Sequence, residues 1–233
     1  MLTIRRADER GSFDYGWLDT KHTFSFGRYY DEKWMGFGTL RVINDDIVAP
    51  GAGFGEHPHR NMEIVTWVLE GALAHGDSLG NAKALRPGWA QAMTAGRGIR
   101  HSEFNGSKTE PVRLLQIWIE PKQEGTEPRH EDREFPMSKR KDALCLIASG
   151  DGADGSLEIG QDARVYVGTI GEGVEVKAGL GEGRKGWVQV ARGSAVVNGE
   201  LLKEGDGVGL EREREIVVEG GKGGVEVLVF DVP

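Results

Sequence analysis

Short apolar runs separated by glycine turns restrict the fold of this chain more than any other feature. The first half contains three such runs, at residues 38–45, 63–71 and 112–121. The second half contains five, at residues 163–170, 186–193, 193–199, 214–221 and 224–233. Their length, β-branched content and glycine boundaries are typical of β-strands, and helical periodicity is weak. With 36 glycines against 8 prolines, the sequence predicts an all-β protein with few short helices.

A polar stretch divides these strands into two groups. Residues 121–142, PKQEGTEPRHEDREFPMSKRKD, carry many charges and three prolines, which is typical of a linker between folded units. The first group also resembles the second: TWVLEGALA and ALRPGW match VQVARGSAV and LLKEGDG in order and pattern, which indicates an internal duplication. We therefore expect an N-terminal domain over 1–130 and a C-terminal domain over 131–233.

All six histidines stand in the first of these domains. They are His22, His57, His59, His75, His101 and His130. When Gly71 is aligned with Gly193, the second half has Gly179 and Gly181 in place of the first histidine pair. Any chemistry that needs imidazole therefore belongs to the first half, and the second domain is expected to be a degenerate copy.

Two short motifs indicate a metal site in the first half. His57 and His59 flank one proline in GEHPHRN, and His101 and Glu103 stand two apart in GIRHSEFN, each pair close to glycines. In a strand, residues i and i+2 face the same side, about 6.6–6.8 Å apart. If the two segments pair, their four side chains can surround one divalent ion. A single HxH is common without any metal, whereas two such pairs favour a metal site.

The same motifs resemble a known superfamily. The segment from Gly51 through FGEHPHRNME fits the first cupin motif, G-x5-H-x-H-x3-E, and GIRHSEFN fits the second, although Gly96 replaces its proline. Together with HTFSFGRYY, GFGTLRVINDD and DSLGN, they resemble the pirins, above all the short bacterial ones. The resemblance covers most of residues 5–121 and is thin in the second half.

This resemblance implies a fold, a metal and an activity. Pirins are bicupins, two tandem β-barrel (jelly-roll) domains, with one metal, usually iron, in the first barrel. The resemblance places their ligands at His57, His59, His101 and Glu103. Short bacterial pirins are described as quercetin 2,3-dioxygenases, which open the flavonol ring with O₂ and release carbon monoxide. We expect Fe(II), with Mn, Co, Ni, Cu or Zn left open, because mixed nitrogen and oxygen ligands suit them all.

Two other functions are compatible with these motifs. Pirins of animal nuclei are described as transcriptional cofactors, so a metal- or redox-sensing protein that acts through protein partners is the main alternative. A sugar isomerase or decarboxylase on the same scaffold is a third, because a fold does not determine a function.

Other polar residues receive weaker assignments. Glu63 has the parity of His57 and His59, so an unbroken strand would turn it toward the same cavity, where it could orient an imidazole. The alternative is that Glu63 is an acid of the barrel rim that faces solvent. Glu103, with Glu63 in reserve, is the candidate catalytic base. The other three histidines are interpreted as structural: His22 in a core, His75 in a hairpin and His130 solvated in the linker. Cys145, the single cysteine, is interpreted as a buried small hydrophobe.

Charge and hydropathy exclude some partners. The formal charge of −8 and the pI near 5.4 argue against direct nucleic-acid binding, which needs a basic surface. The start, MLTIRRADERG, lacks the apolar region of a signal peptide, and no run approaches the length of a membrane span. We therefore expect a cytoplasmic monomer whose partners are a small aromatic substrate and O₂.

Overall fold

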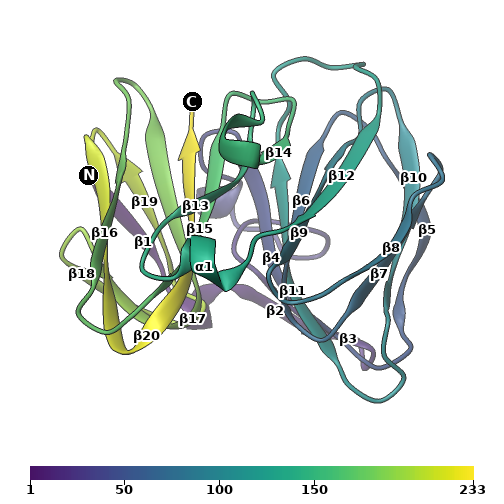
Figure 1. Ribbon diagram of the computed structural model, residues 1–233, viewed down its shortest axis with the longest axis horizontal. Coiled ribbons are helices and arrows are strands. Elements are labelled where there is room, and N and C mark those ends of the chain that lie inside the picture. Colours follow the sequence, from purple (N-terminus) through teal and green to yellow (C-terminus); the bar gives the residue numbers. More distant parts are fainter.

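The computed structural model describes all 233 residues and contains two β-rich lobes side by side (Figure 1). The first lobe is formed by a seven-stranded sheet, ordered β12-β9-β6-β11-β4-β3-β2, and a four-stranded sheet, ordered β5-β10-β7-β8. Its strands are β2 (Gly11–Asp14), β3 (Leu18–His22), β4 (Leu40–Val48), β5 (Gly53–His59), β6 (Glu63–Glu70), β7 (Leu73–Asp77), β8 (Ala82–Leu85), β9 (Trp89–Thr94), β10 (Ile99–Asn105), β11 (Val112–Ile119) and β12 (Arg129–Glu134).

The second lobe is one nine-stranded sheet that curls on itself. Its strands are β1 (Leu2–Arg5), β13 (Cys145–Ser149), β14 (Leu157–Glu158), β15 (Arg164–Ile170), β16 (Glu175–Gly179), β17 (Lys185–Val197), β18 (Glu200–Lys203), β19 (Gly207–Glu211) and β20 (Glu215–Val232). Helices are short: η1 (Ala7–Glu9), η2 (Glu32–Trp34), η3 (Ala153–Gly155) and α1 (Met137–Arg140). The prediction of a mostly β chain with two barrels is confirmed.

The division between the lobes differs from the expected one in two places. Strand β1 pairs with β19, so the N-terminal residues complete the second barrel. Strand β12 pairs with β9, so residues 129–134 form an edge strand of the first barrel, and the expected boundary at 130/131 falls inside it. The interpretation of 121–142 as a linker is wrong for this part. Its charged residues are tolerated because an edge strand leaves one side open to solvent.

The two lobes share one apolar core. A cluster of 24 buried residues joins the outer face of the seven-stranded sheet, including Val65 and Trp67, to Trp187 and Phe230 of the second barrel. The indole Nε1 of Trp67 also donates a hydrogen bond to Glu226 across the interface, at 2.9 Å. Residues of β6 that face this interface therefore cannot face the interior of the first barrel, since neighbours in a strand alternate sides.

Glycines bend the strands at equivalent places in both lobes. The predicted strands at 186–193 and 193–199 are one strand, β17, whose register shifts at Gly193. Gly71 and Gly193 have φ of +73° and +76°, and a Cβ on either would meet a carbonyl oxygen of the neighbouring segment, at Pro111 and Gly224 respectively. This shared geometry supports the alignment of the two halves on these glycines.

We expect Gly193→Ala to lower the free energy of unfolding by about 2 kcal/mol or more. An L residue with positive φ costs about 1–2 kcal/mol, and the contact with the Gly224 carbonyl adds to it. Gly173→Ala is the matched control, because Gly173 has φ +71° and a Cβ added there would have no other atom within 4 Å. Urea unfolding of both variants measures the difference; equal losses would show that the close approach contributes nothing.

Candidate metal centre

Strands β5 and β10 bring the two sequence motifs together. In their antiparallel pairing, His57 lies directly opposite His101, and His59 lies opposite Ile99. Strand β5 is an edge of the four-stranded sheet, as Pro58 predicts, because proline cannot donate to a second neighbour. The register shifts between His101 and Glu103, so the second motif is bent where it passes the first.

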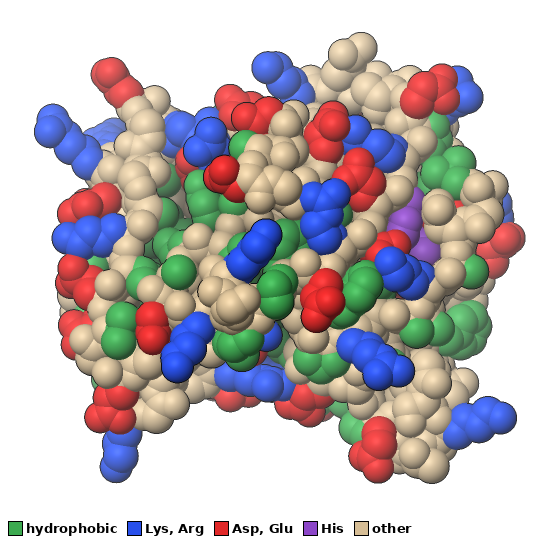
Figure 2. Space-filling view, viewed as in Figure 1, with side chains coloured by type: hydrophobic (Ala, Val, Ile, Leu, Met, Phe, Trp, Pro, Cys, Tyr) green, Lys and Arg blue, Asp and Glu red, His purple; other side chains and the backbone are tan.

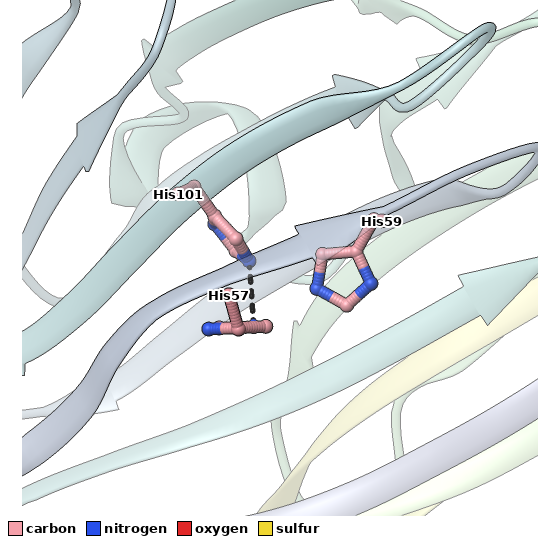
Figure 3. A group of neighbouring side chains, drawn as sticks. All are labelled: His57, His59 and His101. Carbon is pink, nitrogen blue, oxygen red and sulfur yellow. Dashed lines mark hydrogen bonds between the residues drawn. The ribbon is translucent and has the colours of Figure 1, made fainter.

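Three imidazoles converge at this pairing (Figure 3). The ring centroids of His57, His59 and His101 lie 4.5–4.8 Å apart, and one ring nitrogen of each lies within 4.8 Å of the others. Nε2 of His101 is 3.1 Å from Nε2 of His57. His101 is buried, whereas His57 and His59 are partly exposed. The three side chains have the spacing that a single divalent ion needs after a small contraction.

Hydrogen bonds determine which nitrogens are free. His57 Nδ1 lies 2.8 Å from the carbonyl oxygen of Gly55. Because a carbonyl only accepts, His57 Nδ1 carries the proton and its Nε2 offers a lone pair toward His101. A ligating imidazole is typically held in this way by a backbone carbonyl or a carboxylate. His101 Nδ1 is buried without a hydrogen-bond partner.

Glu103 lies on the inner side of this triad, against His101 rather than among all three rings. Its register partner on β7 is His75, and the ligand atoms of Glu103, His75 and His101 lie within 4.8 Å of one another. The side chain is almost fully buried. Its two oxygens accept hydrogen bonds from Gln91 Nε2 at 2.5 Å and Gln116 Nε2 at 2.7 Å. Burial raises the pKa of the Glu103 carboxyl.

A polar row on the seven-stranded sheet holds this carboxylate. Gln91, Thr66 and Gln116 are cross-strand partners on β9, β6 and β11, and Thr66 Oγ1 is hydrogen-bonded to both amides, at 3.0 and 2.7 Å. These three residues were not predicted from the sequence. A polar residue at the centre of an apolar strand, as in WAQAMT and LLQIWI, is the signal that could have found them.

Burial keeps two of the imidazoles neutral. Burial, together with the nearby His57, lowers the pKa of His59 to about 4 and that of His101 to about 3. A neutral imidazole is the form that binds a metal. These two ligands therefore do not need to lose a proton to the metal at any pH above about 5.

The pH dependence of metal binding tests whether these two histidines are neutral. We expect the apparent Ni²⁺ affinity to fall by less than about tenfold between pH 7.5 and 5.5. With ordinary pKa values near 6.5, each of His59 and His101 would be about nine-tenths protonated at pH 5.5, and affinity would fall about a hundredfold. Competition with a chelator of known proton affinity, repeated at each pH, measures this. A hundredfold loss would contradict this expectation.

Glu63 lies on the seven-stranded sheet and faces the second lobe, whereas the three histidines lie on the four-stranded sheet, so the expectation that it shares their cavity is wrong. Strand β5 ends at His59, and β6 begins at Glu63 after a turn in which Asn61 has φ +50°. The alternation of side chains along β5 therefore does not continue to Glu63. Glu63 Oε2 accepts a hydrogen bond from Thr94 at 2.6 Å, and its Oε1 lies beside Gly160 of the second lobe. Glu63 therefore serves the contact between the lobes and does not orient an imidazole.

Two histidines interpreted as peripheral lie beside the candidate centre. His75, on β7, is buried and hydrogen-bonded through Nε2 to Asp77 at 3.0 Å. His130, on β12, stacks on His75 with ring centroids 4.2 Å apart and an angle of 11°. The prediction that His130 is solvated in a linker is therefore wrong, because the linker region adds a strand to the barrel. His22 lies in an aromatic core, as expected, against Phe13 and Phe26.

Aromatic side chains pack against the triad. Trp118 meets His59 edge-to-face at 5.0 Å, and Phe26 meets Trp118 in the same way at 5.3 Å. On the other side, the centroid of the Phe54 ring lies 6.4 Å from that of His57 and 5.2 Å from that of Trp17. On the face shown in Figure 2, histidine reaches the surface at one place on the first lobe, among charged side chains. The aromatic rings beside the triad offer surfaces that suit a flat aromatic ligand.

Comparison with known proteins identifies the family. Residues 3–119 match the family described as Pirin, and residues 146–232 match the one described as Quercetinase C-terminal cupin domain. The chain belongs to the pirin family. It is 44% identical to the protein named quercetin 2,3-dioxygenase of Escherichia coli K12, over 100% of this chain and 99% of the relative. It is also 44% identical to a pirin-like protein of Caulobacter vibrioides over 94% of each chain.

Solved pirin structures agree with the fold. The crystal structure of bacterial pirin YhhW from Escherichia coli in complex with nickel(II) superposes with a TM-score of 0.94 and 44% identity, covering 100% of this chain and 99% of that one. The predicted pirin resemblance and bicupin fold are thus confirmed. The predicted metal centre has its three histidines in place, and a homologue binds a metal. No helix of this pirin is long and apolar enough to cross a membrane.

Proposed function

We propose that this pirin is a metal-dependent dioxygenase that opens the ring of a flavonol such as quercetin with O₂ and releases carbon monoxide. The convergence of three imidazoles beside an aromatic wall carries the proposal. The full-length relationship to a protein named quercetin 2,3-dioxygenase supports it.

The proposed metal ligands are His57, His59, His101 and Glu103. The donor set fits: three histidine nitrogens lie within 4.8 Å of one another, and the Glu103 carboxylate lies next to His101. Fe(II) is our first choice, and the nickel(II) complex of YhhW shows that a close relative accepts another ion. When bound, such a metal supplies Lewis acidity that stabilises negative charge on a substrate oxygen, which contributes several kcal/mol.

The protein side chains would bind and orient the flavonol. Trp118 and Phe26 on one side and Phe54 on the other offer aromatic surfaces on which a flat ring can pack, each contact contributing about 0.5–1.5 kcal/mol beyond area burial. Inside the barrel, Asn44 Oδ1 and His22 Nδ1 are buried without hydrogen-bond partners. Polar atoms of this kind favour a ligand that carries hydroxyl groups over a purely apolar one.

Glu103 is the proposed base for the flavonol 3-hydroxyl. Burial raises its pKa, which makes its carboxylate a better proton acceptor, and the two glutamine amides fix its orientation. Its place beside His101 puts it next to the substrate oxygen that the centre would hold. Asp46 is another buried acid in this barrel, where burial raises its pKa to about 7; it belongs to none of the histidine clusters.

Oxygen consumption with quercetin tests the proposal. Protein reconstituted with Fe²⁺ should consume one O₂ and release one carbon monoxide per quercetin, and the protein stripped of metal should do neither. An electrode for O₂ and a haem-protein assay for carbon monoxide provide the two measurements. Absence of both in protein that holds its metal would contradict the proposal and favour the alternative, a metal- or redox-sensing binding protein.

A further inference from the structure

A cavity of about 690 Å³ lies between the two lobes and is separate from the metal centre. Its walls come from the end of β6, the turn before β9, α1, the end of β15, and the bends of β17 and β20. Helix α1 marks this junction of the lobes in Figure 1. None of the lining residues is a proposed metal ligand, and no part of the proposed reaction uses them. The volume is in the range of small-molecule sites.

One wall of the cavity is a buried arginine with an incomplete set of hydrogen-bond partners. Arg140, the last residue of α1, is only 8% exposed. Its Nε donates to the carbonyl oxygen of Phe135 at 3.3 Å, and its Nη1 donates to Thr169 Oγ1 at 2.7 Å. Its Nη2 lies beside Gly88 of the cavity wall, 3.5 Å from the position that a Cβ on that glycine would take. This nitrogen donates to no other residue, so two N–H groups of the guanidinium remain free.

No carboxylate is hydrogen-bonded to Arg140. The nearest belongs to Glu226, whose Oε1 lies 3.7 Å from Arg140 Nη1, which is beyond hydrogen-bond distance. The same Oε1 already accepts a hydrogen bond from Trp67 Nε1 at 2.9 Å. Arginine is almost never buried unless it is paired, and hydrogen bonds between a guanidinium and an anion are stronger than neutral ones. An anionic group bound at Nη2 would supply the missing partner.

The other charged side chains of the cavity also favour an anion. Three cations line it against two acids. Lys141 lines it without an ion pair, and Arg192 is paired with Glu70, which is outside the lining. The second lining acid, Asp142, already accepts a hydrogen bond through Oδ1 from the backbone N–H of Gly171 at 2.7 Å. The acids of the cavity are therefore engaged elsewhere, whereas two of its three cations lack a hydrogen-bonded carboxylate.

The uncharged part of the lining shows which kind of anion fits. It consists largely of glycine backbone and of apolar side chains, namely Val68, Leu69, Met137, Ile170 and Val225. An inorganic anion would leave this apolar surface without a partner, whereas an organic anion with a flat apolar body would cover it and gain from its burial.

The geometry points to a binding site for an aromatic carboxylate between the two lobes. The carboxylate binds at Arg140 Nη2, and the ring packs against the apolar side chains of the cavity. A guanidinium presents planar N–H groups that match a carboxylate. This site is independent of the proposed dioxygenase reaction, since it shares no residue with the metal centre.

Binding of 2-naphthoate to the metal-loaded protein, measured by ligand-observed NMR, tests this site. We expect a dissociation constant of about 1 mM or lower, and binding of the neutral isostere 2-naphthamide at least about tenfold weaker. Met137 lines the cavity and is 47% exposed, so it can be replaced without disturbing a core. Met137→Glu places a like charge beside the ligand and should weaken 2-naphthoate binding at least about fivefold. The matched Met137→Gln should change it by less than about twofold.

Arg140→Gln should weaken 2-naphthoate binding at least about tenfold, because hydrogen bonds to a charged group are lost. Lys139→Gln, on the same helix but outside the cavity lining, should change it by less than about twofold. His59→Ala should bind 2-naphthoate as the wild type does, which distinguishes this cavity from the metal centre. Equal binding of acid and amide, unchanged binding by Met137→Glu or by folded Arg140→Gln, or loss of binding in His59→Ala would overturn the site. If thermal unfolding shows that Arg140→Gln is not folded, the Met137 pair decides alone.

Discussion

Replacing His101 by alanine is expected to leave less than about one tenth of a metal ion per chain and to lower quercetin turnover by at least about a thousandfold. His101 is one of the three converging imidazoles, with His57 and His59, and its ligand atoms also lie within 4.8 Å of those of His75 and Glu103. Its loss leaves only His57 and His59 of the triad, with Glu103 placed against the missing ring, so the remaining donors no longer converge on one point. Lewis-acid assistance then disappears together with the metal.

Metal analysis and O₂ uptake on the same preparation measure this effect. His22→Gln is the control for loss of one imidazole from the same barrel, because His22 lies among aromatic rings and belongs to no ligand cluster; its metal content should match that of the wild type. Circular dichroism should show that both variants are folded. Full metal content and turnover in His101→Ala protein would place the metal elsewhere in the molecule.

Local patterns were enough to predict several of the strands and to single out the three histidines of the triad. Period-two alternation and glycine boundaries locate β4, β6, β11 and β15 to within a few residues, because burial of one or both strand faces imposes those patterns. The histidine pair on β5 and His101 on β10 follow from the same rule, since residues two apart share a side. The prediction of one site also assumed that these two strands pair. The structure supports that assumption, because His57 lies opposite His101 in the register of β5 and β10.

The errors came from structure that is not local. Residues 129–134, RHEDRE, have the composition of a linker, and only their pairing with β9 makes them a strand that brings His130 against His75. The N-terminal strand likewise pairs with β19, about 200 residues away. Neither pairing leaves a signal in the segment itself. For Glu63, the assumed parity failed because Arg60, Asn61 and Met62 turn the chain into the other sheet.

The position of Glu63 allows a paired test of the catalytic base. Glu103 and Glu63 are both almost fully buried glutamates whose pKa is raised by burial, but they face opposite sides of the first barrel's wall. Glu103→Gln should lower kcat for quercetin about a hundredfold to ten-thousandfold, the usual contribution of a general base. Glu63→Gln, which alters a contact with the second lobe, should change kcat by less than about threefold.

Both variants must be compared at equal metal content, because Glu103 is also a proposed ligand. If the three histidines retain the metal in Glu103→Gln protein, the loss of kcat at equal content reports proton transfer and not an empty site. Glu103→Asp keeps a carboxylate near His101 and should recover part of the loss, which a purely structural role of the glutamate would not require. A large fall in kcat for Glu63→Gln with an unchanged Glu103→Gln would reverse the assignment and require the two lobes to move apart during turnover.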